Sequence, residues 1–85
     1  MKNTFMDETQ IFEKLNEVFH LVFDDDNITV SRETTAADID EWDSLMHITL
    51  IGEVESTFGI KFSMKEVVGM KNVGEMADII SAKLS

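Results

Sequence analysis

Apolar residues recur along the first quarter of the chain at the spacing of one helical face. They are Ile11, Phe12, Leu15, Val18, Phe19, Val22 and Phe23. Their intervals of three and four residues are typical of an amphipathic helix. Asp7 and Gln10 have the spacing of a capping box, and acidic residues suit a first turn. The pattern therefore predicts a helix over about residues 8–23.

A polar run, Asp-Asp-Asp-Asn at 24–27, follows this helix. Such short polar side chains compete with the helical backbone for hydrogen bonds and favour its end. About 20 residues then lead to Asp43. An unstructured connection of this length is uncommon in a compact domain, so we expect Ile28, Val30 and Ile39 to anchor it to the core.

The second half of the chain contains three further helical patterns. A stripe over residues 44–58 is formed by Leu50, Ile51, Val54 and Phe58, with Leu45 and Ile48 on an adjacent flank. Gly59 is a suitable C-terminal stop for this helix. Ser63 and Glu66 form another capping-box match and open a short helix that ends at Gly69.

Asn72 and Glu75 repeat the cap spacing before a last helix that runs to the C-terminus. Its apolar positions are Val73, Met76, Ile79, Ile80 and Leu84. The prediction is an all-α four-helix bundle with three longer helices, a short third helix and a long first loop. A chain of 85 residues makes one domain, 1–85.

Composition excludes several classes of function. The chain has no cysteine, so a disulfide or a thiolate metal site is ruled out. It lacks an apolar run near the roughly 20 residues of a membrane span, so we expect no stable membrane insertion and a cytoplasmic location. The net charge of −10 repels nucleic acid and anionic lipid and favours partners with basic surfaces. We expect a monomer.

Candidate chemistry centres on Asp43-Ser44-Leu45, directly after Trp42. The tripeptide places a hydroxyl at the start of the helix predicted over 44–58. A phosphate ester there would face free backbone N–H groups and the positive end of the helix dipole. The alternative is that Ser44 only caps the helix.

Enzymatic and metal-binding interpretations fit poorly. Asp43, Ser44 and His47 cannot easily form a relay, because neighbours on one helix project in different directions. An EF-hand loop starting at Asp25 has Val30 in place of the required glycine, and a loop starting at Asp38 puts Trp42 at a ligand position. We therefore predict neither an enzyme nor a metal site.

The segment 38–45 (Asp-Ile-Asp-Glu-Trp-Asp-Ser-Leu), followed by an amphipathic helix, closely resembles the acyl carrier protein family. The likeness includes the helix order, the long first loop, the acidity and Phe58-Gly59-Ile60. It implies that Ser44, flanked by Asp43 and Leu45, carries 4′-phosphopantetheine transferred from coenzyme A by a phosphopantetheinyl transferase. The terminal thiol of that group would hold acyl or aminoacyl groups as thioesters, in fatty acid, polyketide or related biosynthesis.

The resemblance also implies partners with basic docking patches, namely acyl-activating, acyl-transferring or condensing enzymes. The expected partner-binding residues are Asp40, Glu41, Leu45, Ile48, Glu53 and Glu55. For Leu45 and Ile48, contact with the prosthetic arm or ordinary core packing are the alternatives. Trp42 either stacks on the arm or shields the loop. Cargo is either exposed to a partner or held in a cleft among Ile51, Val54, Ile60, Phe62 and Val68.

Three positions depart from the family pattern. Housekeeping fatty-acid carriers commonly have acids where Met46 and Thr49 stand, and often a methionine where Gly52 stands. These departures favour a dedicated freestanding carrier, and they leave the cargo open among fatty acyl, polyketide, aminoacyl and cell-envelope intermediates. The alternatives from other classes are an unmodified acidic helical protein-interaction module and a metal-sensing bundle.

Overall fold

The computed structural model describes residues 6–84, and regular structure in this part of the chain is entirely helical. The elements are α1 (Glu8–Phe23), the 3₁₀ turn η1 (Ala36–Asp38), α2 (Ser44–Phe58), α3 (Met64–Gly69) and α4 (Val73–Leu84). The predicted all-α bundle with a short third helix is confirmed. The predicted domain, 1–85, includes residues 1–5 and 85, which lie outside the described residues.

Local sequence signals define the helix ends. The Asp7 carboxylate accepts a hydrogen bond from the Gln10 N–H at 2.9 Å, and the Gln10 side chain accepts one from the Asp7 N–H at 3.1 Å. α1 stops where Asp24 adopts a left-handed conformation with φ 53°. Gly59 ends α2 with φ 67°, which glycine tolerates because it has no Cβ. The capping prediction for α1 and the stop at Gly59 are confirmed.

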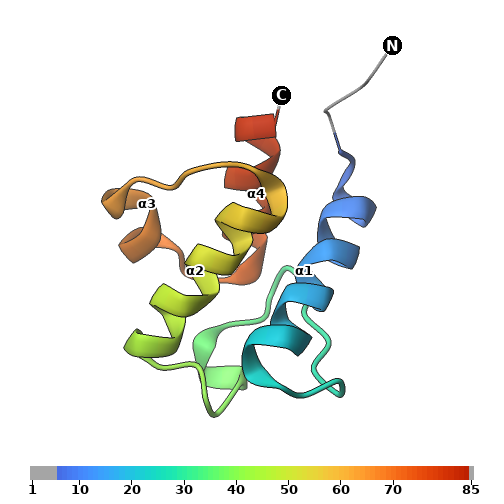
Figure 1. Ribbon diagram of the computed structural model, residues 1–85, viewed down its shortest axis with the longest axis vertical. Helices are drawn as coiled ribbons and strands as arrows, with labels where there is room; N and C mark the ends of the chain where they lie inside the picture. Colours follow the sequence, from blue (N-terminus) through green and yellow to red (C-terminus); the bar gives the residue numbers. More distant parts are fainter. Residues whose placement is uncertain (1–5, 85) are drawn as a thin grey trace.

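The hydrophobic core lies where α1 packs against α2 and α4 (Figure 1). Its fully buried side chains include Leu15, Phe19, Leu50, Val54 and Ile80. Figure 1 shows α3 on the far side of α2 from α1, next to the segment that enters α4. α3 is therefore the helix with least support from the core.

The long connection is held in place by backbone and side-chain bonds. Val30 is buried, while Ile28 and Ile39 are half-buried. The Val30 N–H donates to the side-chain oxygen of Asn16 in α1 at 2.8 Å. The Gly74 N–H, at the start of α4, donates to the carbonyl oxygen of Arg32 at 2.9 Å. These bonds link the loop to α1 and α4.

Close approach of the loop to α4 makes Gly74 sensitive to substitution. A Cβ there would lie 2.9 Å from the carbonyl oxygen and 3.0 Å from the Cβ of Arg32. We expect Gly74→Ala to push the loop away and lower the free energy of unfolding by roughly 1–3 kcal/mol in urea denaturation. Gly52→Ala is the matched control, because a Cβ at Gly52 meets no heavy atom within 4 Å. It should raise stability by about 0.5–1 kcal/mol, and equal stability of the two variants would contradict the account.

Candidate functional site

Ser44 is the first residue of α2, and its side chain is exposed. The cap of this helix is Asp43, whose carboxylate accepts a hydrogen bond from the Met46 N–H at 2.8 Å. The carbonyl of Asp43 accepts one from the His47 N–H, also at 2.8 Å. The capping role considered for Ser44 is thus filled by its neighbour. Within residues 6–84, the hydroxyl of Ser44 makes no hydrogen bond.

The start of α2 is electrostatically suited to an anion. The first N–H groups of a helix lack intrahelical partners, and the helix dipole concentrates positive charge there. Asp43 satisfies the N–H groups of Met46 and His47, whereas those of Ser44 and Leu45 have no partner among the described residues. A phosphate ester on the Ser44 hydroxyl would be close to both of these free donors.

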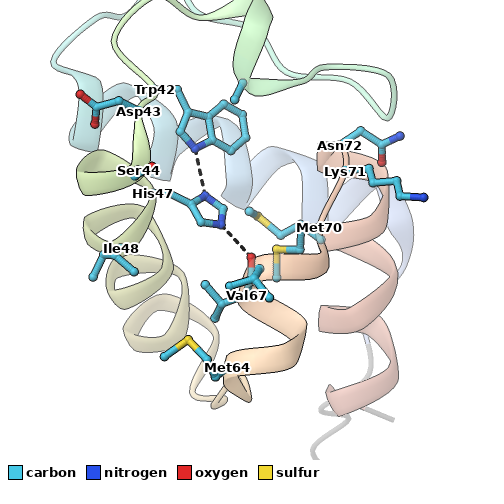
Figure 2. A pocket seen from close by; sticks show the side chains of 13 residues that line it. Trp42, Asp43, Ser44, His47, Ile48, Met64, Val67, Met70, Lys71 and Asn72 are labelled. Carbon is cyan, nitrogen blue, oxygen red and sulfur yellow. Dashed lines mark hydrogen bonds between the residues drawn. The ribbon is translucent and has the colours of Figure 1, made fainter.

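A cavity of about 570 Å³ opens beside Ser44 (Figure 2). It lies between α2, α3 and the segment that leads into α4. Its lining consists of Ala36, Trp42, Asp43, Ser44, His47, Ile48, Met64, Val67, Val68, Met70, Lys71, Asn72 and Met76. Methionine side chains are flexible and polarisable, so three of them give this cavity a wall that adapts to different apolar groups.

The cavity differs from the cleft that the sequence indicated. Of the five residues expected there, only Val68 lines it. Ile51, Val54 and Ile60 are buried in the core instead. The reason is the position of α3, which leaves space on the outer side of α2, whereas the inner side is already filled by α1 and α4.

Trp42 forms part of the core and of the cavity wall. Its indole packs edge-on against Phe19 with ring centroids 5.2 Å apart, and its ring centroid lies 6.3 Å from that of Phe23. The indole N–H donates to Nδ1 of His47 at 3.0 Å, and Nε2 of His47 lies 3.0 Å from the carbonyl oxygen of Val67 in α3. From the sequence, His47 was considered as a member of a catalytic relay, and this connection was not predicted.

The residues expected to bind partners lie on the loop and along α2. Asp40 and Glu41 are exposed just before the helix, and Leu45 and Ile48 are 76% and 57% exposed. Glu53 and Glu55 are half-buried. One oxygen of Glu55 accepts a hydrogen bond from the Phe62 N–H at 2.8 Å, so this carboxylate also fixes the loop between α2 and α3.

Two apolar residues of α3 extend the exposed surface of α2. Met64 is 72% exposed and Val68 is 74% exposed, and both line the cavity beside Ile48. Met64 was not among the site residues expected from the sequence, and Val68 was expected in an internal cleft. Nothing in the sequence indicated that these two side chains would be exposed beside the cavity, because a six-residue helix shows no complete hydrophobic period.

Glu66 joins α3 to α4. Its carboxylate accepts a hydrogen bond from the Ser63 N–H at 2.8 Å and lies 3.2 Å from the ammonium of Lys83. The Ser63 N–H and, to a lesser extent, Lys83 lower the pKa of Glu66 below its ordinary value. The Ser63–Glu66 capping box expected from the sequence is confirmed.

The lowered pKa of Glu66 predicts an acid-dependent contribution to stability. Because the pKa is lower in the folded than in the unfolded chain, the charged carboxylate stabilises the fold above the ordinary glutamate range. The contribution disappears as pH falls through the lowered pKa. We expect Glu66→Gln to unfold more easily than the wild type at pH values above the ordinary glutamate pKa of about 4.3, with the difference shrinking as the pH falls through the lowered pKa. Glu17→Gln, at an exposed position on α1, is the control, and a difference that grows on acidification would contradict this.

Two negative findings apply to residues 6–84. The structure brings together no group of three or more histidine, cysteine, aspartate or glutamate side chains suited to holding a metal ion. None of the helices in this part of the chain has the length and apolar character needed to cross a membrane.

Comparison with known proteins agrees with the geometry. The family model described as a phosphopantetheine attachment site matches residues 9–80. The solution NMR structure of a holo acyl carrier protein from Geobacter metallireducens is 47% identical, with a TM-score of 0.82. The match covers 87% of this chain and 85% of that one. No curated protein sequence matches the chain significantly. The chain belongs to the acyl carrier protein family, whose covalently attached prosthetic group is 4′-phosphopantetheine.

Proposed function

We propose that this protein is a carrier of acyl or aminoacyl thioesters and that Ser44 is its attachment residue. The observation that carries the proposal is the position of Ser44. Its side chain is exposed at the start of α2 beside a cavity, and the N-cap of this helix is Asp43 instead. The membership of the chain in the acyl carrier protein family supplies the identity of the group.

The residues around Ser44 fit a phosphopantetheine arm. The N–H groups of Ser44 and Leu45, which have no partner among the described residues, would be available to a phosphodiester on the hydroxyl, and Asp43 keeps the first turn of α2 in place. The apolar cavity starts next to the hydroxyl and is open to solvent, so it can receive part of the arm or its cargo. The terminal thiol of the arm supplies the thioester chemistry, and the protein itself acts as carrier rather than as enzyme.

Attachment requires a phosphopantetheinyl transferase and coenzyme A. The Ser44 oxygen attacks the phosphorus nearest to the pantetheine in the pyrophosphate of coenzyme A. A P–O bond to Ser44 forms, adenosine 3′,5′-bisphosphate leaves, and the hydroxyl proton passes to a base of the transferase. Exposure of Ser44 at the surface favours such a reaction, because the transferase has to reach the hydroxyl directly.

Docking of partner enzymes is proposed on the surface around Ser44. Leu45 and Ile48 offer exposed apolar contact, and the surrounding acids are Asp40, Glu41, Glu53 and Glu55. Exposed ion pairs contribute only about 0–1 kcal/mol each, so the acids govern the rate of encounter and the choice of partner more than affinity. This suits a carrier that has to dissociate after each transfer. Met46, Thr49 and Gly52 favour a specialised pathway over housekeeping fatty acid synthesis.

The competing proposal is an unmodified acidic helical protein-interaction module. The exposed apolar side chains beside acidic residues on α2 would serve that role equally well. Intact-protein mass after incubation with coenzyme A and a broad-specificity transferase separates the two. Addition of one phosphopantetheine supports the carrier, whereas no addition to folded protein with several transferases supports the module. A cytoplasmic location and a monomeric state remain predictions from the sequence.

A further inference from the structure

The outward face of α2 carries no charge. Its exposed residues are Ser44, Leu45, Ile48, Thr49, Gly52, Ser56 and Thr57. The two acids of the helix, Glu53 and Glu55, are half-buried on its flanks. In a chain with a net charge of −10, this face therefore offers a partner neutral and apolar contact instead of carboxylates.

α3 extends this face with two further apolar side chains. Met64 and Val68 are exposed, and both line the cavity together with Ile48. Figure 2 shows Ile48 between Asp43, just before α2, and Met64, at the start of α3. Leu45, Ile48, Met64 and Val68 thus form one surface, which we call the apolar strip. Clustered exposed apolar side chains mark surfaces that contact another molecule.

Charges of opposite sign stand at the two ends of the apolar strip. Before α2, the exposed acids are Asp40, Glu41 and Asp43. At the other end the exposed charges are lysines, Lys61 on the connection from α2 to α3 and Lys65 in α3 itself. Lys65 and Val68 are three residues apart on one helix, so they share its outward face.

Both lysines are free to meet a partner. Among the described residues, Lys61 and Lys65 form no ion pair. The neighbouring Glu66 is already paired with Lys83 at 3.2 Å. Lys61 borders a hollow of about 500 Å³ that it shares with Glu55, whose carboxylate already accepts a backbone hydrogen bond. The acids around the lysines thus have partners of their own.

The two charged ends act separately. Residues 24–43 hold eight acids and one arginine, whereas residues 60–71 hold three lysines and one glutamate. α2 lies between them, and its 15 residues at roughly 1.5 Å each place its ends about 20 Å apart. This exceeds the Debye length of about 8 Å at physiological ionic strength, so the acids before α2 hardly weaken the field at the lysines. A chain that is acidic as a whole therefore presents a partner with one basic end.

We propose that the apolar strip docks a partner protein whose contact patch is apolar in the middle, basic at one end and acidic at the other. The basic groups of the partner face the acids before α2, and its acidic groups face Lys61 and Lys65. The link to cargo transfer rests on the proposed function, because an enzyme seated here reaches Ser44 beside Leu45. A partner with an evenly basic patch meets like charge at the α3 end and is disfavoured. Each exposed ion pair changes affinity by roughly fivefold or less, so the charges govern the orientation and choice of the partner.

The test is a titration of ¹⁵N-labelled apo protein with two synthetic helical peptides, followed by NMR in about 0.15 M salt. Both peptides carry the same apolar face. The bipolar peptide has lysines at one end and glutamates at the other, and the basic peptide has lysines at both ends. We expect the bipolar peptide to shift the signals of the apolar strip, and a spin label at its glutamate end to broaden α3 but not the start of α2. Binding elsewhere, equal broadening at both ends, or no binding of the bipolar peptide would overturn the proposal.

Lys65→Glu separates the local charge from the net charge of the chain. It should weaken the bipolar peptide roughly threefold to tenfold and strengthen the basic peptide by a similar factor, because the reversal replaces an attraction by a repulsion and the converse. Lys61→Glu should act in the same direction. Lys14→Glu is the matched control, since Lys14 is exposed on α1, on the other side of α2 from α3, and the change in charge is the same. Equal effects of Lys65→Glu and Lys14→Glu on the two peptides would contradict the proposal.

The titrations use no coenzyme A, so their outcome is separate from the loading test. A chain that is loaded on Ser44, but in which Lys65→Glu does not alter the choice between the peptides, keeps the carrier role and loses the proposed docking surface. A chain that binds the bipolar peptide as expected but is not loaded keeps the surface as an interaction module. Signals of the apolar strip that shift with protein concentration alone would assign the face to a second copy of this chain, and would also overturn the proposal.

Discussion

Replacement of Ser44 by alanine is expected to abolish phosphopantetheine loading entirely while leaving the fold intact. The oxygen of Ser44 forms the phosphodiester in the proposed reaction, and alanine offers no nucleophile in its place. The hydroxyl makes no hydrogen bond within residues 6–84, because Asp43 caps α2. Its removal should therefore change the free energy of unfolding by less than about 0.5 kcal/mol. Intact-protein mass after incubation with transferase and coenzyme A measures the loading.

Ser56→Ala is the matched control for this prediction. Ser56 is exposed on the same helix but lies about three turns away from Ser44 and does not line the cavity. The Ser56→Ala protein should gain one phosphopantetheine as the wild type does. Loading of folded Ser44→Ala protein would remove Ser44 from the proposed role.

Trp42→Ala is expected to have the largest effect on stability, a loss of about 3–5 kcal/mol in the free energy of unfolding. The indole is buried, packs against Phe19 and Phe23, and donates a hydrogen bond to His47. Removing it leaves a cavity at the end of the long loop and unpairs Nδ1 of His47. A domain of this size has only a few kcal/mol of net stability. A loss of this size should therefore leave the variant close to its unfolding midpoint even without urea.

Urea denaturation followed by circular dichroism measures this loss, and Trp42→Phe keeps the test informative if the alanine variant does not fold. Phenylalanine retains an aromatic ring in the core but lacks the N–H, so it should cost about 1–2 kcal/mol. A loss below about 1 kcal/mol for Trp42→Ala would mean that the indole only shields the loop, which was one of the interpretations open from the sequence.

The helices and their caps were predictable because the signals for them are local. Asp7 with Gln10 and Ser63 with Glu66 form their bonds within one turn, so residue spacing alone indicates them. The placement of Ser44 at the start of a helix followed from the same kind of signal. The 3₁₀ turn at Ala36–Asp38 was not predicted, since three residues carry no hydrophobic period.

The cavity and the two hydrogen bonds of the His47 ring depend on contacts that cannot be read from the sequence. His47 meets a backbone carbonyl twenty residues away, and every residue type offers such a carbonyl. The cavity forms because α3 stands off the outer side of α2, an arrangement set by tertiary packing. For that reason the sequence placed the expected cleft among Ile51, Val54 and Ile60, which the structure shows to be core residues.

The central claim is that Ser44 carries the prosthetic group, and fragmentation mass spectrometry of the loaded wild-type protein tests it most directly. The protein is incubated with coenzyme A and transferase, and its peptides are sequenced to locate the added phosphopantetheine. We expect one group per chain, on Ser44. A group on any other residue, or no group on folded protein after treatment with several transferases, would contradict it.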